Sequence, residues 1–123
     1  MRPLSPHLTV YSFKENMLTS IVFRGTGILM FGGLVALGGV ALVGKHKFPA
    51  YVYVLQQMPA LNFLVKFFAA FPLTYHLLGG LRHLAWDNIM FHSLKDAKTS
   101  GYAALGTAAA VAVVASVMEA DPE

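Results

Sequence analysis

The fold of this chain is decided by residues 21–44, IVFRGTGILMFGGLVALGGVALVG, an apolar run that holds one charged residue, Arg24. Two further apolar stretches follow it along the chain. As helices rising about 1.5 Å per residue, all three are long enough to cross the roughly 30 Å of hydrocarbon in a bilayer. The composition agrees, since 56% of the 123 residues are hydrophobic and 12% are charged. We therefore expect an all-α membrane protein, a single domain over residues 1–123, with transmembrane helices at about 20–44, 60–86 and 101–118.

The segments outside the three runs have distinct compositions. Residues 1–19 are polar, and Pro3 and Pro6 disfavour an early helix, so we expect an extended arm that lies at the membrane surface and grips a partner. The loop of residues 45–59 contains Phe48, Tyr51 and Tyr53, aromatic rings that suit the headgroup zone and favour a short interfacial helix. The arm and the glycine-rich first span indicate one component of a larger, heteromeric helical bundle.

The basic residues are distributed unevenly over the two sides of the predicted membrane protein. Three spans place one group of six on the side of the N-terminus and two lysines on the other side, while Lys66 is placed to snorkel from the second helix. The residues of the first group are Arg2, Lys14, Arg24, Arg82, Lys95 and Lys98, and the opposing pair is Lys45 and Lys47. Because positive loops stay on the inner side, the N-terminus is expected to face the matrix or cytoplasm.

Several function classes are excluded by what the sequence lacks. It contains no cysteine, which removes disulfides, thiolate metal sites and cysteine nucleophiles. It has no phosphate-binding glycine loop with its lysine and no HExxH run. The lysines are scattered over two membrane faces, so the sequence predicts no nucleic-acid partner.

The chemistry is expected in residues 75–87, YHLLGGLRHLAWD, where ionisable side chains end an apolar span. His76 and His83 are about two helical turns apart and lie on nearly the same face, with Gly79 and Gly80 between them. An imidazole beside missing side chains could ligate the iron of a flat macrocycle, whose other axial ligand would come from another chain. Alternatively, His76 hydrogen-bonds a neighbouring helix and His83 lies in water at the interface.

Two more groups have both a functional and an ordinary interpretation. Arg82 and His83, with Asp87, lie near the positive-side boundary, where a cation can pair with haem propionates, but Arg82 could equally snorkel. Ser20 and Arg24 are four residues apart on one face of the first helix, where a hydroxyl and a guanidinium could donate to quinone carbonyls. An arginine anchor and a serine cap explain the same two residues.

Three segments together resemble the cytochrome b large anchor subunits of succinate dehydrogenase, respiratory complex II. They are residues 2–12, RPLSPHLTVYS, residues 20–27, SIVFRGTG, and residues 75–87, whose pattern is HxxxGxRHxxxD. The order, the spacing and the three-span layout of that family fit nearly the whole chain.

The resemblance implies a four-subunit complex in which a flavoprotein oxidises succinate, an iron–sulfur subunit relays electrons, and two membrane anchors bind quinone and usually one haem b. It implies that His76 is the axial haem ligand, with the other imidazole from the small anchor. It also implies a quinone pocket at Ser20 and Arg24 with Ile21 as an apolar wall. The enzyme would be succinate dehydrogenase (quinone), and this chain would hold no catalytic residue and perform no dicarboxylate chemistry itself.

One position departs from the family pattern. Family members commonly have a histidine directly before the arginine, near the haem propionates, whereas this chain has Phe23. The departure leaves Arg24, Arg82 and His83 as the local candidates for the propionates.

The leading hypothesis is therefore a ubiquinone-reducing anchor that shares haem b with a small anchor subunit. Its expected location is the mitochondrial inner membrane with the N-terminus on the matrix side, or alternatively a bacterial cytoplasmic membrane. A b-type haem electron-transfer protein outside complex II and a non-redox, structural three-helix subunit are the rival hypotheses.

Overall fold

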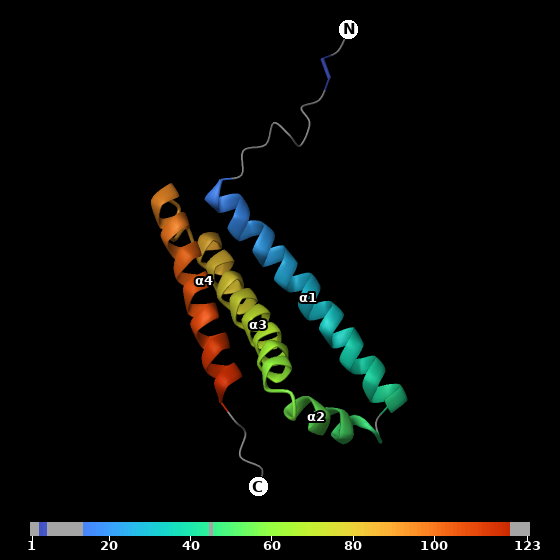
Figure 1. Cartoon of the computed structure of the whole chain (residues 1–123). Helices are drawn as coiled ribbons and strands as arrows, with labels where there is room; N and C mark the ends of the chain where they lie inside the picture. Colours follow the sequence, from blue (N-terminus) through green and yellow to red (C-terminus); the bar gives the residue numbers. More distant parts are fainter. Residues whose placement is uncertain (1–2, 5–13, 45, 119–123) are drawn as a thin grey trace.

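The computed structural model describes residues 3–4, 14–44 and 46–118, and within these ranges it is built of four α-helices and no β-strand. The helices are α1 (Glu15–Gly44), α2 (Phe48–Gln56), α3 (Pro59–Asp87) and α4 (Leu94–Val117) (Figure 1). In the same ranges, three segments are long and apolar enough to cross a membrane: Met17–Gly44, Pro59–Asp87 and Leu94–Val117. The expectation of an all-α protein with three spans is confirmed.

Two helices begin earlier than the apolar runs suggested. Helix α4 starts at Leu94, and its polar first turns precede the expected start at residue 101. Ser93 caps it, because the Ser93 hydroxyl accepts from the Asp96 backbone N–H at 3.0 Å and donates to the Asp96 carboxylate at 2.6 Å. Helix α1 likewise includes residues 15–19, the end of the expected arm, most of which lies outside the described residues.

Helix α2 confirms the short helix expected in the first loop. Its sequence starts Phe-Pro, and proline is favoured in the first turn of a helix because the N–H groups there have no helical partner. Phe48, Tyr51 and Tyr53 are exposed, as aromatic rings of a headgroup-level helix would be. Helix α2 joins the far end of α1 to the start of α3 (Figure 1).

Helices α3 and α4 form the most extensive contact of the structure. The buried face of α4 carries small residues at intervals of one or two turns, Gly101, Ala108, Ala112 and Ser116, and both alanines are 0% exposed. Small side chains let two helix backbones approach closely in lipid, where no hydrophobic effect draws helices together. The small-residue face of α4 therefore explains its close contact with α3.

A cationic side chain from α3 reaches α4 at each end of this pair. Near the start of α3, the Lys66 ammonium donates to the Met118 carbonyl at 2.9 Å, at the C-terminal end of α4. Near the end of α3, the Arg82 guanidinium donates to the Ser100 hydroxyl at 2.9 Å and to the Ala97 carbonyl. Cations at helix C-termini satisfy free carbonyls and oppose the helix dipole, so Lys66 stabilises the end of α4.

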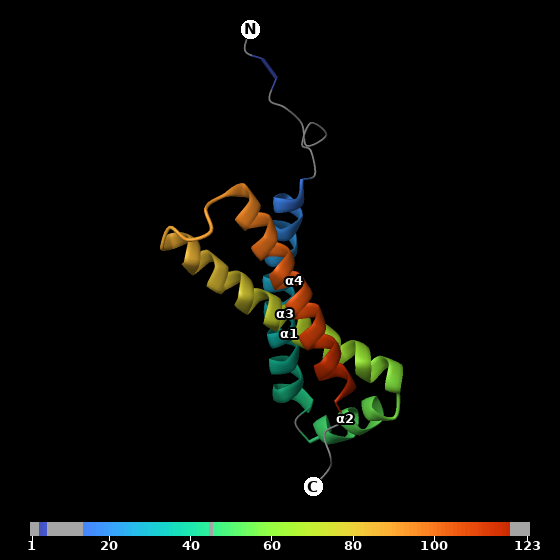
Figure 2. The same ribbon diagram turned by 90° about the vertical axis from the view of Figure 1, so that its left-hand side faces the viewer.

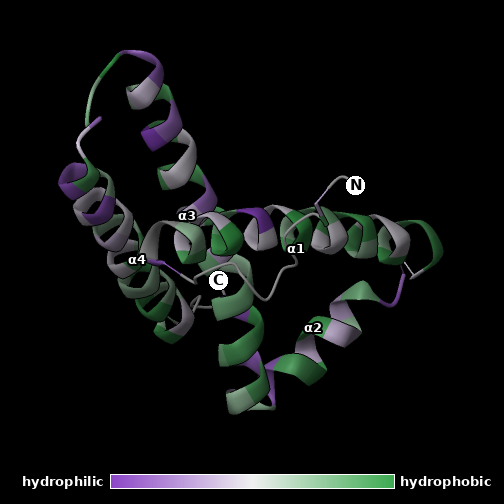
Figure 3. Ribbon diagram, turned by 90° about the horizontal axis from the view of Figure 1, so that it is seen from above, coloured by the Kyte–Doolittle hydropathy of each residue, from purple (hydrophilic) through white to green (hydrophobic). Residues whose placement is uncertain are grey.

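Helix α1 packs against the α3–α4 pair mainly through its first half. Figures 1 and 2 together show that α3 crosses α1 at an angle. The two helices meet where the Phe23 ring lies against Gly79, and the residues from 31 to 43 are all exposed. Hydrophobic residues predominate along this helix when the molecule is viewed from above (Figure 3). A largely apolar groove of about 780 Å³ lies between residues 27–37 of α1 and helix α3, and His76 and Pro72 line its α3 side.

We predict that Gly79→Ala destabilises the protein while Gly80→Ala does not. A Cβ at Gly79 would overlap the Phe23 ring, whereas a Cβ at Gly80 would meet no atom within 4 Å. Overpacking of this kind costs about 1–3 kcal/mol. Thermal unfolding of the two variants in detergent measures the difference, and equal midpoints would contradict this description of the crossing.

Candidate functional site at the crossing of α1 and α3

His76 extends from α3 toward α1 and is half-buried between them. Its Nδ1 atom lies 3.3 Å from the Phe23 carbonyl oxygen and 3.4 Å from the Thr26 hydroxyl oxygen. The Thr26 hydroxyl, which is 6% exposed, donates to the same Phe23 carbonyl at 2.7 Å. Gly27 lies beside the ring, and a Cβ there would be 3.1 Å from His76 Cε1, so the imidazole would have to shift by a few tenths of an ångström. The first half of α1 thus surrounds one side of the imidazole.

Phe23 covers one face of the His76 ring. The two rings are parallel, with centroids 4.2 Å apart and planes inclined by 4°. The Phe23 ring also occupies the space that Gly79 leaves open on α3. The expectation that Gly79 and Gly80 together open a face for a macrocycle is therefore wrong at Gly79, because an aromatic ring from α1 fills that gap; the space beside Gly80 is open.

His83 and Asp87 lie farther along α3, toward the end of the helix, and both are exposed. The His83 ring is tilted against Phe23, with ring centroids 5.2 Å apart. It also makes a T-shaped contact with Trp86, with ring centroids 4.9 Å apart. The two histidines therefore do lie on one face of α3, as their spacing predicted, and Phe23 lies against both.

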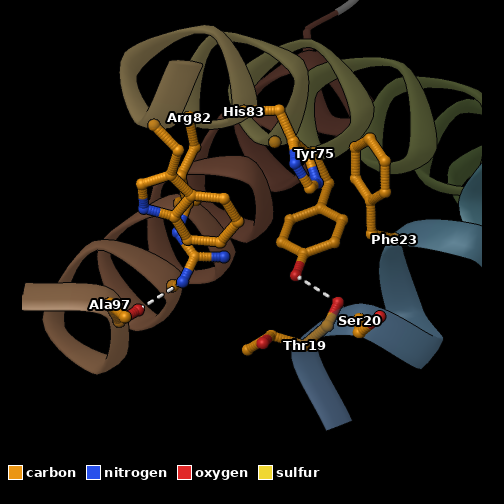
Figure 4. A pocket seen from close by; sticks show the side chains of 11 residues that line it. Thr19, Ser20, Phe23, Tyr75, Arg82, His83 and Ala97 are labelled. Carbon is orange, nitrogen blue, oxygen red and sulfur yellow. Dashed lines mark hydrogen bonds between the residues drawn. The ribbon is translucent and has the colours of Figure 1, made fainter. Parts of the chain in front are cut away.

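Arg82 points toward α4 and away from His76. In addition to its bonds with Ser100 and Ala97, its guanidinium carbon lies 4.1 Å from the centroid of the Trp86 ring, a cation–π contact. Arg82 borders a cavity of about 140 Å³ among α1, α3 and α4 (Figure 4). Tyr75, which is 3% exposed, donates to the Thr19 carbonyl at 3.1 Å on the other side of this cavity.

The predicted quinone residues lie at the start of α1. Ser20, Ile21 and Arg24 are all exposed, and Ser20 and Arg24 are one turn apart on the same face. Ser20 also lines the small cavity beside Tyr75 and Arg82 (Figure 4). Arg24 and Ile21 do not line that cavity, so this chain by itself offers an open platform rather than a closed pocket.

Sequence reasoning missed Phe23, Thr26 and Tyr75 as contributors to the site. The signal for Thr26 was its position between Gly25 and Gly27, a polar side chain in an apolar run where a partner for its hydroxyl is needed. In the described part of the chain, no three His, Cys, Asp or Glu residues gather in one place. The chemistry available is one imidazole at a groove, with an exposed hydroxyl and guanidinium at the start of α1.

Comparison with known proteins gives a consistent family. The family described as succinate dehydrogenase/fumarate reductase transmembrane subunit matches residues 1–115 of the chain. The mitochondrial succinate dehydrogenase cytochrome b560 subunit of Dictyostelium discoideum is 38% identical over 115 residues, which cover 92% of this chain and 60% of that protein. The corresponding human subunit is 44% identical over 89 residues, 70% of this chain and 53% of the human protein.

A bacterial relative matches over a larger share of its own length. The succinate dehydrogenase cytochrome b556 subunit of Paracoccus denitrificans is 32% identical over 120 residues, which cover 95% of this chain and 91% of that protein. The chain thus spans 60% and 53% of the Dictyostelium and human relatives, and nearly all of the bacterial one.

We predict that Arg82→Ala loosens the contact of α3 with α4. A hydrogen bond that involves a charged group contributes about 1.5–3 kcal/mol, and the variant loses two such bonds together with the Trp86 contact. Thermal unfolding in detergent should therefore show a clear loss for Arg82→Ala and a smaller one for Ser100→Ala. Lys95→Ala, an exposed cation in the first turn of α4, is the control; a loss of the same size in this variant would contradict the role of Arg82.

Proposed function

Because the chain belongs to the family of succinate dehydrogenase/fumarate reductase transmembrane subunits, we propose that it is the larger membrane anchor of a succinate:quinone oxidoreductase. Its partners are a flavoprotein subunit, an iron–sulfur subunit and a small anchor subunit. The succinate chemistry belongs to the flavoprotein. This chain binds quinone and shares one haem b with the small anchor, so that electrons from the iron–sulfur subunit reach ubiquinone.

The observation that carries this proposal is the environment of His76. Both atoms near its Nδ1 are acceptors, since the Phe23 carbonyl has no proton and the Thr26 hydroxyl directs its proton to that carbonyl. The hydrogen-bond network therefore assigns the ring proton to Nδ1 and leaves a lone pair on Nε2. Among the described residues, none forms a hydrogen bond with Nε2. An imidazole that donates its other N–H to a backbone carbonyl is the usual arrangement of a metal-ligating histidine.

These residues fit haem b at the groove between α1 and α3. His76 would supply one axial nitrogen, and the apolar lining of the groove suits a porphyrin. When bound, haem supplies a one-electron carrier in the membrane. Arg24 and His83 are exposed and are the better candidates for the propionates, whereas Arg82 would first have to leave Ser100 and Ala97.

Quinone is proposed to bind at the start of α1. Ser20 would donate to one carbonyl oxygen, Arg24 would stabilise negative charge that develops on the oxygens during reduction, and Ile21 would cover the ring. These side chains are exposed in the isolated chain, so the partner subunits would supply the remaining walls. A fixed cation in a dry site acts more strongly than in water, which is why closure by partners matters to the chemistry.

The proposed location is the mitochondrial inner membrane, or the cytoplasmic membrane if the chain is bacterial, with the N-terminal side facing the matrix or cytoplasm. The start of α1, the end of α3 and the start of α4 lie at one end of the molecule (Figure 1). This end holds most of the basic residues among the described ones: Lys14, Arg24, Arg82, Lys95 and Lys98. The charge pattern supports the orientation through the positive-inside rule.

We predict that His76→Ala abolishes the b-type absorption band of the reduced, purified complex. The loss follows because the variant removes the only axial nitrogen proposed for this chain. His92→Ala, in the exposed α3–α4 loop, is the matched control and should keep the band. Copurifying flavin and iron–sulfur subunits must be present in both preparations, and a band of full height in His76→Ala would overturn the assignment.

We predict that Arg24→Ala lowers quinone reduction about tenfold or more while succinate oxidation by an artificial acceptor is unchanged. The variant removes a charged donor worth about 1.5–3 kcal/mol, and 1.4 kcal/mol corresponds to a factor of ten. Lys95→Ala serves as the control for the loss of a cation on the same side of the membrane. Unchanged quinone turnover in Arg24→Ala would count against this quinone site.

A further inference from the structure

Phe23 contacts the His76 imidazole in two independent ways. The Phe23 ring is stacked on the imidazole, parallel to it within 4° at a centroid separation of 4.2 Å. The Phe23 carbonyl oxygen lies 3.3 Å from Nδ1 and, in the tautomer assigned above, accepts a hydrogen bond from the Nδ1–H group. The hydrogen bond fixes one atom of the imidazole and leaves the ring free to tilt about that atom. The stacked ring removes this freedom on the side it covers.

Phe23 itself is held in place from behind. Its ring lies in the space that Gly79 leaves on α3, and a single added methyl group there would collide with it. The His83 ring packs against the Phe23 ring with centroids 5.2 Å apart. Trp86 in turn contacts His83 edge to face, with ring centroids 4.9 Å apart. The Phe23 ring is therefore packed between the α3 backbone at Gly79 and the imidazole of His76.

The groove side of His76 offers no comparable support. Gly27 stands beside the imidazole edge and has no side chain, and the ring borders the groove of about 780 Å³. Without Phe23 the imidazole could tilt back toward Gly79, where the space would be vacant. The plane of the imidazole, and with it the direction of the Nε2 lone pair, therefore depends on the aromatic ring at residue 23.

We propose that Phe23 is the positioning residue of His76, an aromatic wedge that sets the plane of the imidazole presented to the groove. This inference rests on the proposed function, in which His76 ligates haem iron. The polar contacts at Nδ1 choose the tautomer, and the Phe23 ring chooses the orientation. Groups that orient a metal ligand commonly change metal affinity by 10–100-fold when they are removed.

The direct test measures the stack in the reduced complex. In wild-type protein with labelled histidine, the ring signals of His76 are identified by their loss in His76→Gln. They should carry an upfield shift from the ring current of Phe23 in addition to the shift that the porphyrin causes. Phe23→Leu should lose the Phe23 part of this shift and Phe23→Tyr should retain it. The matched control is Phe67→Leu, which removes a half-buried ring on α3 that stacks on Phe63 and Phe71 and not on His76.

The second measurement follows the consequence at the iron in the same variants. Phe23→Leu should change the g-anisotropy of the low-spin ferric signal, which reports the imidazole plane, and lower the haem-to-flavin ratio by up to about tenfold. Phe23→Tyr should restore both, and Phe67→Leu should match wild type.

The possible failures point to different conclusions. A wild-type complex without a b-type band would overturn the haem assignment of the proposed function, while the ring-current measurement would still decide whether Phe23 holds His76. Equal His76 ring shifts in wild type and Phe23→Leu, or an unchanged ferric signal in Phe23→Leu, would overturn the positioning role. Equal changes in Phe67→Leu would show a general packing effect and would overturn it as well.

Discussion

The arrangement of this chain depends on a steric condition at one residue, the absence of a side chain at Gly79. Because the backbone of α3 is bare at that point, the Phe23 ring of α1 can lie directly against it. The same ring then reaches His76, whose imidazole lies parallel to it. The crossing of two helices and the orientation of the histidine that lines the groove thus follow from the packing of one ring. The close approach that glycine permits between helices in lipid here serves a site as well as the fold.

The structure divides into a closely packed part and an open part. Helices α3 and α4 are packed through small residues and joined at both ends by the side chains of Lys66 and Arg82. Helix α1 leaves this pair after its first half and exposes the apolar surface of the second half. The polar groups proposed to meet quinone and haem all lie where α1 still contacts α3 or just before. The closely packed pair therefore carries His76, and the groove leaves one side of its imidazole open.

The sequence predicted the helices well and the contacts between them only in part. Long apolar runs identify spans because a bilayer demands them, but the start of α4 was missed because its cap at Ser93 precedes a polar turn that hydropathy does not register. His76 was chosen as a candidate because ionisable side chains within a span are costly to bury, and its role stays a prediction. That the Phe23 ring occupies the space at Gly79 could not be predicted, because the residue spacing along α3 does not determine which side chain of α1 packs there. Tyr75 and Thr26 were not identified as parts of the site, because their hydrogen-bond partners on α1 could not be predicted from the sequence either.

The position of the crossing also gives α1 a mechanical property. From Phe23 to Gly44 the helix extends roughly 30 Å, at about 1.5 Å per residue, and in the described residues α2 links that far end to α3. Most of the length of α1 therefore lies on one side of the crossing. A rotation of about 10° there displaces the far end by about 5 Å on a helix of this length. A mismatch between the apolar length of α1 and the thickness of a bilayer would tilt this helix, and a small tilt at the crossing would change the width of the groove.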